Sequence, residues 1–484
     1  MEETLDFSPE EFEKLLQRAS ALLVQQYAHV DTQKGFAGFS PKEVESWFDE
    51  PLPMAGSDGL RFLDEVKARV IDTATGNLGP NMYAYVMSGG SQVATVAELL
   101  ASTVNQNVAK WHLAPAMTEI EKRVVKWAAE MIGYTPEAGG AMVSGGSAAS
   151  LAGLTVARNV YFREKNINQT GLFGQSPFVV YGSNQTHNST DKSIALLGIG
   201  TDHFRKIGTH ADYTIDVDQL EKQIQADIRA GYQPFCVVGN AGTVNTGAID
   251  DLNALAGIAE KYKLWFHVDG AYGGLASSLP SLRGAYAGLE KADSVALDFH
   301  KWLYQPFEVG CVLVRSWGSL RETYFKQADY LGAAVAHASD RLEFNEHYFQ
   351  LSRNAKAFKV WMSLKVYGFE KIQRMIQKDI ELTHYLADRV AGSDDFELRS
   401  RSHLAITCFR YVAHLRTEEE TEHFNQKLVA ALEADGRVFI TGTVLDGVYV
   451  LRACLTNHRK QVSSVDYLLE TIRDVARRLM EPGG

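Results

Sequence analysis

Cysteine is scarce in this chain of 484 residues, which has only Cys236, Cys311, Cys408 and Cys454. No two of them show C-x-x-C spacing, so the sequence predicts neither a zinc ribbon nor a disulfide framework, and no metal site is expected. Isolated buried thiols are typical of proteins in a reducing compartment. We therefore expect a cytoplasmic protein.

Long apolar runs and excess positive charge are also missing. No stretch of about 18 apolar residues occurs, so no membrane-spanning segment is predicted. The acidic N-terminus, which begins Met1-Glu2-Glu3, lacks the basic and apolar regions of a signal peptide. Lys and Arg total 48 against 59 Asp and Glu, which gives a net charge of −11. This balance disfavours nucleic-acid binding and favours a small-molecule partner.

The composition is that of a globular protein, with 45% hydrophobic and 22% charged residues. The length predicts roughly three structural units. Ser-Pro-x-Glu at residues 8–11 and again at 40–43 begins two helices, each with one narrow apolar stripe. These stripes fit packing against the chain itself or against a second subunit. We divide the chain into a helical arm (1–80), a large α/β domain (81–370) and a small α+β domain (371–484).

Short apolar runs alternate with helical stretches between residues 81 and 370, which favours a mostly parallel sheet covered on both faces. The predicted strands cover residues 178–181, 235–239, 264–268, 294–297 and 311–314, and the predicted helices include residues 217–230, 252–262 and 355–388. For the tail we predict strands at 404–411, 437–441 and 448–453 and helices at 418–433 and 465–479. Ligands of such parallel sheets bind beyond the carboxyl ends of the strands.

Unusual residues follow three of these strands. They are Asp269, the stretch Asp298-Phe299-His300-Lys301, and His187; a fourth feature is the Gly-rich stretch Ser144-Gly145-Gly146-Ser147, which leads into a helix of small residues. Each one alone is most often a cap, a turn or a solvated side chain. Together they fit these roles poorly, because Asp269 lies among apolar residues and glycines with no basic neighbour. A buried carboxylate without a partner is costly.

Pyridoxal phosphate would satisfy all four features. A lysine amine forms a Schiff base with its aldehyde, and a carboxylate keeps its pyridine nitrogen protonated. A flat imidazole can stack on the ring, and a Gly-rich loop that begins a helix can hold the phosphate through backbone N–H groups. Ala271 lies two residues beyond Asp269 on the same strand face and leaves room for the ring.

These stretches resemble the group II pyridoxal-phosphate-dependent amino-acid decarboxylases, of the aromatic-L-amino-acid decarboxylase kind. The family's H-V-D-A-A-Y appears at residues 267–272, with Gly270 in place of one Ala, and its S-x-x-x-x-x-H-K-W appears at residues 294–302. The resemblance runs from about Asn81 to the C-terminus. It implies fold type I, a homodimer joined in part by the arm, and conversion of an L-amino acid into the amine and carbon dioxide.

The resemblance also implies residue roles. Lys301 would be the Schiff-base lysine, Asp269 the pyridinium partner and His187 the stacked imidazole. Tyr330 falls where the family carries a mobile catalytic loop, with a Tyr that protonates the carbanion left after carbon dioxide departs. Further cofactor contacts are expected at Gly145, Gly146, Ser147, Thr243, Ala271, Asp298 and His300, and substrate contacts at Tyr85, Ser88, Trp111 and Arg353.

Substrate choice is less well defined by the sequence. The apolar and aromatic surroundings of Tyr85 and Trp111 favour an aromatic substrate. Two positions differ from many relatives, because Gly79-Pro80 replaces a His-Pro and Val309 replaces a Cys or Ala. The open alternatives are decarboxylation of an acidic or diamino acid, aldehyde-forming oxidative decarboxylation, and an aminotransferase or carbon–carbon lyase. A non-catalytic dimeric homologue would be expected to lose Lys301 or Asp269, and both are present.

Overall fold

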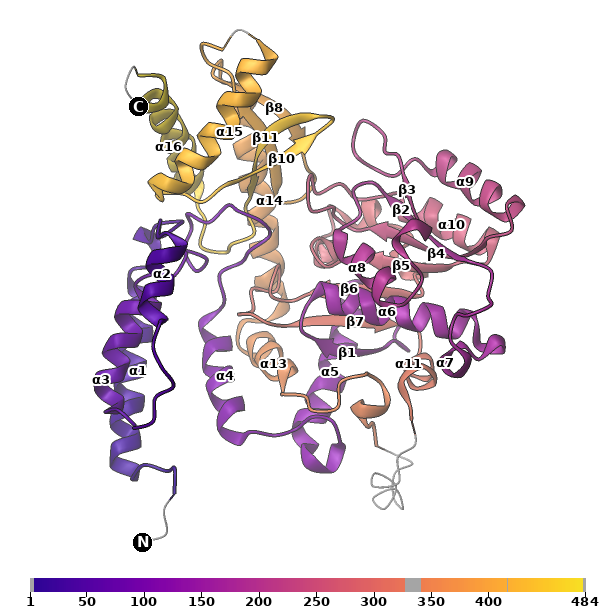
Figure 1. Ribbon diagram of the computed structural model, residues 1–484, viewed down its shortest axis with the longest axis horizontal. Coiled ribbons are helices and arrows are strands. Elements are labelled where there is room, and N and C mark those ends of the chain that lie inside the picture. Colours follow the sequence, from indigo (N-terminus) through magenta and orange to yellow (C-terminus); the bar gives the residue numbers. More distant parts are fainter. Residues whose placement is uncertain (1–3, 327–340, 416, 482–484) are drawn as a thin grey trace.

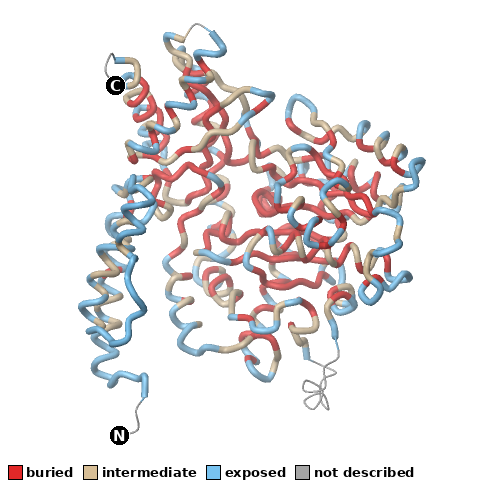
Figure 2. The backbone as a smooth tube through the Cα atoms, in the orientation of Figure 1, coloured by how far each residue is buried: buried red, intermediate tan, exposed pale blue. Residues whose placement is uncertain are grey.

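The computed structural model describes residues 4–326, 341–415 and 417–481 (Figure 1). The chain begins with an arm of three helices, α1 (Pro9–Ala28), α2 (Pro41–Phe48) and α3 (Gly59–Val66). As predicted, Ser8 and Ser40 cap the first two helices, and each hydroxyl accepts a hydrogen bond from the N–H three residues later. Within these three helices only Leu22 is buried, and most of the arm is exposed (Figure 2).

A seven-stranded sheet in the order β1-β7-β6-β5-β4-β2-β3 forms the large part of the molecule. Neighbouring strands from β6 to β3 run parallel, and β7 is antiparallel to both β1 and β6. The predicted α/β class with a mostly parallel sheet is confirmed. The strands are β1 (Gly139–Val143), β2 (Phe178–Ser183), β3 (Phe204–Ile207), β4 (Gln233–Asn240), β5 (Trp265–Asp269), β6 (Ser294–Asp298) and β7 (Gly310–Val314).

Helices cover both faces of this sheet. On one face lies α6 (Gly146–Tyr161), and on the other lie α5 (Pro115–Met131), α9 (Val217–Arg229) and α10 (Leu252–Tyr262). Every residue of β1, β2, β6 and β7 is buried, which explains why their sequences are continuous apolar runs. The other helices of this part are α4 (Gln92–Val104), α7 (Ile167–Thr170), α8 (Asn188–Leu196), α11 (Trp317–Tyr324) and α13 (Lys356–Tyr367).

The single helix predicted over residues 355–388 is wrong. The structure divides it into α13, which ends at Tyr367, and α14 (Phe369–Ala391). Gly368 separates them with φ +74°, a left-handed conformation that glycine adopts without steric cost. The two helices can therefore change direction between the large and small sheets.

The small sheet contains four antiparallel strands in the order β10-β11-β9-β8. Its elements are β8 (Phe396–Arg401), β9 (Ile406–Tyr411), α15 (Glu418–Asp435), β10 (Thr441–Leu445), β11 (Val448–Cys454) and α16 (Val462–Met480). The strand predicted at 437–441 is wrong, because β10 begins only at Thr441, and β8 was not predicted. Residues near 81 also pair with this part, since the Tyr83 N–H donates to the Phe439 carbonyl at 2.7 Å.

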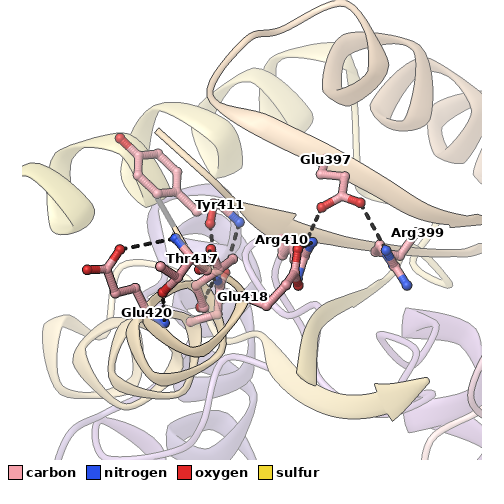
Figure 3. Close-up of polar contacts among 9 residues, drawn as sticks. Glu397, Arg399, Arg410, Tyr411, Thr417, Glu418 and Glu420 are labelled. Atoms are coloured by element: carbon pink, nitrogen blue, oxygen red, sulfur yellow. Dashed lines mark hydrogen bonds and ion pairs between the residues drawn. The ribbon is translucent and has the colours of Figure 1, made fainter. Parts of the chain in front are cut away.

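A buried arginine joins three elements of the small sheet region (Figure 3). Arg410 of β9 pairs with Glu397 of β8 and, at 2.6 Å, with Glu418 of α15. The predicted capping box at the start of α15 is present: the Glu420 N–H donates to Thr417 Oγ1 at 3.1 Å, and the Thr417 N–H donates to the Glu420 carboxylate at 3.2 Å. These contacts fix the start of α15 beside the sheet edge.

The four cysteines are buried and free, as the sequence predicted. They lie on separate elements, with Cys236 in β4, Cys311 in β7, Cys408 in β9 and Cys454 in β11. Over residues 4–326, 341–415 and 417–481, no helix is both long and apolar enough to cross a membrane.

Candidate active site

A cavity of about 490 Å³ opens at the carboxyl ends of the central parallel strands. It brings together side chains that lie more than 200 residues apart in the sequence. The predicted site residues that line it are Tyr85, Gly145, Gly146, Ser147, His187, Thr243, Asp269, Ala271, Asp298, His300 and Lys301. The cavity therefore lies where parallel α/β sheets bind their ligands.

Lys301 is held by the carboxylate that ends β6. Its Nζ lies 3.1 Å from Asp298 Oδ2, and its side chain is 21% exposed, so the amine faces the cavity without being freely solvated. The same oxygen lies 3.5 Å from His300 Nε2. Asp298 Oδ1 is buried without a hydrogen-bond partner among the described residues. The amine is thus fixed at the cavity wall by a short turn after β6.

Asp269 ends the neighbouring strand β5 and is 9% exposed. Its Oδ1 accepts a hydrogen bond from the Ala271 N–H at 3.1 Å, and no ion pair in the described part of the chain includes its carboxylate. A nearly buried carboxylate needs a cation, because its desolvation is otherwise uncompensated. A protonated ring nitrogen in the cavity would supply that cation.

His187 caps α8 and lies on the cavity wall. Its Nδ1 accepts a hydrogen bond from the Ser189 N–H at 3.2 Å and lies 2.8 Å from Ser189 Oγ, which leaves the ring proton on Nε2. Burial lowers the pKa of His187, and the nearby Asp269 only partly opposes this effect. The imidazole is therefore neutral and flat at neutral pH, as a ring-stacking group should be.

The Gly-rich stretch forms the start of α6 and supplies the fourth feature. Gly145 occupies the N-cap position without a side-chain cap, so the first N–H groups of α6 lack intrahelical partners and are free to bind an anion such as a phosphate group. A Cβ at Gly146 would lie 2.7 Å from Ala271 Cβ and 2.9 Å from Asp298 Oδ2. Only glycine leaves this space open. The amine, the unpaired carboxylate, the imidazole and the uncapped helix together fit pyridoxal phosphate.

Three predicted substrate contacts do not line the cavity. Arg353 is buried in an ion pair with Glu121 and donates to the Met142 carbonyl at 2.8 Å. The Trp111 indole donates to Glu119 at 3.2 Å, and Ser88 donates to the His300 carbonyl at 2.6 Å. Ser88 thus supports the turn that holds Lys301. Tyr330 lies outside the described residues.

The cavity also contains residues that the sequence reasoning missed, namely Ser189, Asn240, Val244, Tyr272, Phe307 and Glu308. Asn240 ends β4 just as Asp269 ends β5, and this strand-end position was the available signal. No pattern marked Phe307 and Glu308, which lie between β6 and β7. Lys359 holds their backbone, because its Nζ donates to the Pro306 and Glu308 carbonyls at 3.0 and 3.1 Å.

Lys359 also connects this loop to α4. It is 3% exposed and lies 2.6 Å from Glu98, which belongs to α4. Burial lowers the pKa of Lys359, and the pairing with Glu98 opposes that effect. The cavity wall at Phe307 is therefore anchored through one buried ammonium group to a helix on the outside of the molecule.

Comparisons with known proteins agree with this site. Residues 41–412 match the family described as the pyridoxal-dependent decarboxylase conserved domain. An aromatic-L-amino-acid decarboxylase from Bacillus atrophaeus is 32% identical over 99% of this chain and 98% of that protein. The Oryza sativa TDC, crystallised with PLP and tryptamine, superposes with a TM-score of 0.93 at 27% identity, covering 99% and 100% of the two chains.

A second solved structure is similar. The Rhodiola rosea 4-hydroxyphenylacetaldehyde synthase has a TM-score of 0.87 and 25% identity, and the match covers 99% of this chain and 100% of that one. The likeness to these proteins extends over nearly the full length, including the arm and the small sheet. With the site geometry and the family match together, this chain belongs to the pyridoxal-dependent decarboxylase family and is a pyridoxal-phosphate-dependent carboxy-lyase.

Proposed function

We propose that this enzyme decarboxylates an aromatic L-amino acid to the corresponding amine. When bound, pyridoxal phosphate accepts the electron pair that the substrate releases as carbon dioxide leaves. The chain supplies the groups that hold the cofactor for this task. Lys301 supplies the amine that binds the aldehyde, and the carboxylate of Asp269 keeps the ring nitrogen protonated.

The character of the cavity wall is the observation that carries the substrate class. Its charged lining residues are Lys301 and three carboxylates, Asp269, Asp298 and Glu308, and no arginine lines the described cavity. A substrate with an acidic side chain would meet like charge there. The apolar and aromatic lining, Tyr85, Val86, Met87 and Phe307, instead offers contacts to an aromatic ring.

Neutral His187 and buried Asp269 together favour cleavage of the bond between the substrate Cα and its carboxylate. His187 would stack its flat imidazole on the cofactor ring, and the Asp269 carboxylate would hold the proton of the ring nitrogen, which makes the cofactor a better electron acceptor. The Tyr330 hydroxyl then delivers a proton to the substrate Cα, with His187 as the other candidate donor. Protonation at Cα leads to amine, whereas reaction with dioxygen at that stage leads to aldehyde.

A panel of amino acids tests this proposal. Purified holoenzyme is given the L-isomers of tryptophan, tyrosine, phenylalanine, glutamate, aspartate and 2,4-diaminobutyrate, and carbon dioxide, amine, aldehyde and hydrogen peroxide are measured separately. We expect amine and carbon dioxide in equal amounts from at least one aromatic substrate and none from glutamate or aspartate. Turnover of only acidic or diamino substrates would refute the proposal, and stoichiometric hydrogen peroxide would assign the aldehyde-forming branch.

Two variants test the assigned roles. Lys301→Ala should lose decarboxylation and the borohydride-reducible bond to the cofactor, and retained turnover would remove Lys301 from the mechanism. Tyr330→Phe should divert product from amine toward aldehyde and ammonia, because the proton donor is lost. Unchanged amine yield from this variant would refute the role of Tyr330.

We also propose that the arm and the outward face of α4 join two copies of this chain. Large apolar side chains are exposed on α1 to α3 and on the outward face of α4; they include Phe12, Val24, Phe48, Phe62, Val96, Leu99, Leu100 and Val104. An exposed surface of this kind is typical of an interface. Light scattering should give twice the chain mass of 53.6 kDa, and Leu99→Glu with Leu100→Glu should give the single mass. A monomeric wild type would contradict the proposal.

A cytoplasmic location is also part of the proposal. Its support is the set of four buried and free thiols, which suit a reducing compartment. Fractionation of the native host with antibodies to the chain tests it, and recovery from an extracytoplasmic fraction would contradict it.

A further inference from the structure

A second cavity, separate from the active-site cavity, lies against the segment that follows Lys301. Its volume is about 230 Å³, less than half the 490 Å³ of the active-site cavity, and the two cavities share no lining residue. Residues 303–305 form part of its wall. The rest of the wall comes from the start of α4, from α13 and α14, and from His458 and Arg459 after β11.

Hydrogen bonds tie this segment to the start of α4 and to α13. The Tyr304 N–H donates to the Lys301 carbonyl at 3.2 Å, and the Ser91 N–H donates to the Tyr304 carbonyl at 2.9 Å. The Gln305 side chain accepts a hydrogen bond from the Ser363 hydroxyl at 3.3 Å. A molecule bound in the second cavity would therefore contact the turn that positions the Lys301 amine.

Basic residues supply the charge of the second cavity. Lys371 and Arg459 line it, and its described lining contains no Asp or Glu. Two carboxyl groups act from further away. Asp379 accepts a hydrogen bond from the Tyr304 hydroxyl, and burial raises its pKa to about 7, so only part of it is ionised at neutral pH. Asp31 affects the pKa of Arg459 without forming an ion pair with it.

His458 shows the effect of this positive charge. Its ring meets the Tyr304 ring edge-on at 5.2 Å, and its Nδ1 is buried with no hydrogen-bond partner in the described chain. Lys378 is a third nearby cation, and its Nζ donates to the His458 carbonyl at 2.7 Å. Burial and, to a smaller extent, the three cations lower the pKa of His458 to about 3. Cations that oppose a further positive charge also attract an anion.

Three lining side chains offer donors to such an anion. Lys371 lies 5.2 Å from the centre of the Tyr367 ring, and its Nζ donates to no other described residue. Arg459 donates to the Leu78 and Gly90 carbonyls at 3.1 Å each, which fixes the guanidinium and leaves its Nε unused. The Tyr367 hydroxyl accepts from a backbone N–H of α4 at 3.4 Å and can donate its own proton. A carboxylate, with two acceptor oxygens, matches these donors.

The cavity also has an apolar part. Leu303, Ile372 and Met375 line it, and the last two lie three residues apart on one face of α14. An apolar body would bind there by losing its contact with water. An ammonium group would be repelled by the cations, so neither an amino acid nor an amine suits this cavity. The chemistry therefore differs from that of the substrate and the product.

We propose that the second cavity binds a small carboxylate that has an apolar body and no ammonium group. The bound acid ties α14, which extends from the large part of the molecule to the small sheet (Figure 1), to the segment after Lys301. Because this segment positions the amine that holds the cofactor, occupation of the second cavity slows cofactor loss. The proposal does not depend on the class of amino-acid substrate.

Equilibrium dialysis of the holoenzyme with 3-phenylpropionate tests the binding. We expect saturable binding, and excess phenylethylamine, which carries an ammonium group in place of the carboxylate, should not displace the acid. Lys371 is an exposed residue of α14, so Lys371→Glu should fold, and the reversed charge should weaken binding about fivefold or more. Arg374→Glu is the matched control, because it makes the same change on α14 outside the cavity lining, and it should bind as wild type does.

The rate of cofactor loss is the second measurement. Holoenzyme is dialysed against buffer without cofactor, and the cofactor that remains is followed by its absorbance. Saturating 3-phenylpropionate should slow the loss about fivefold in wild type and Arg374→Glu, and at the same concentration it should have little effect on Lys371→Glu. The proposal would be overturned by absence of saturable binding, by displacement with phenylethylamine, by equal binding to wild type and Lys371→Glu, or by cofactor loss that the acid does not change in wild type.

Discussion

Replacement of Arg353 separates a structural role from a substrate-binding role. The Arg353 side chain is 2% exposed; its guanidinium pairs with Glu121, donates to the Met142 carbonyl and packs 4.7 Å from the centre of the Phe344 ring. Glu121 is fully buried, and its Oε2 has no hydrogen-bond partner among the described residues. Arg353→Met would leave this carboxylate buried and unpaired. The expected loss of unfolding free energy is about 3–5 kcal/mol, the usual cost of breaking a buried ion pair.

Urea denaturation of the apoenzyme measures that loss, and the folded fraction is assayed for kcat and KM. Glu121→Gln combined with Arg353→Met should recover much of the stability, because the unpaired charge is gone. The control is Arg321→Met, which breaks a more exposed ion pair, between Arg321 Nε and Glu346 Oε2 at 2.8 Å. Its expected loss of unfolding free energy is about 0–1 kcal/mol. Wild-type stability of Arg353→Met together with a raised KM would refute this reasoning and restore the substrate role.

Two further predictions concern the cavity floor and a buried carboxyl group. Gly146→Ala should weaken cofactor binding about ten- to hundredfold, because its Cβ would overlap Ala271 and Asp298. Gly257→Ala is the control, because the space around Gly257 is open, and it should bind the cofactor as wild type does. Equal cofactor-titration curves for the two variants would contradict this prediction. Asp379 accepts hydrogen bonds from Trp302 and Tyr304, and burial raises its pKa from 3.8 to about 7. The folded state then binds the proton more tightly than the unfolded state, so up to about 4 kcal/mol of stability is lost as pH rises from about 4 to 7. Asp379→Asn should remove most of this pH dependence of the unfolding free energy, as measured by urea denaturation at pH 5.5 and 8. The same change in unfolding free energy between the two pH values in wild type and variant would contradict the prediction.

The central strands could be predicted because helices cover both of their faces, which leaves an uninterrupted apolar signal. The strands that were missed lie at sheet edges. β3 contains Arg205 and Lys206, and β8 has only Phe396 fully buried, so neither resembles a buried strand. The break at Gly368 was missed because good helix formers such as Leu364, Lys365, Glu370 and Lys371 lie close to it on both sides, and one glycine is tolerated within many helices.

The site was predictable where a strand end coincided with unusual chemistry. Asp269 and Lys301 satisfied that condition, and the structure brings both to one cavity. Asn240 did not, since an asparagine after a strand is an ordinary turn residue and its partner Asp250 is recognised only in three dimensions. Arg353 shows the reverse case, because an arginine in an active-site segment of the sequence can face the interior rather than the cavity.

The buried ammonium of Lys359 links the outer helix α4 to the active-site cavity. It joins α4, whose outer face is apolar and exposed, to the loop that carries Phe307 on the cavity wall. A second copy that covers α4 would restrict the motion of the Glu98 side chain. Because Glu98 pairs with Lys359, and Lys359 binds the loop carbonyls, the motion of that loop would be restricted as well. Because such coupling is reciprocal, occupation of the cavity would in turn strengthen association. Dilution would then lower cofactor affinity before any part of the chain unfolds.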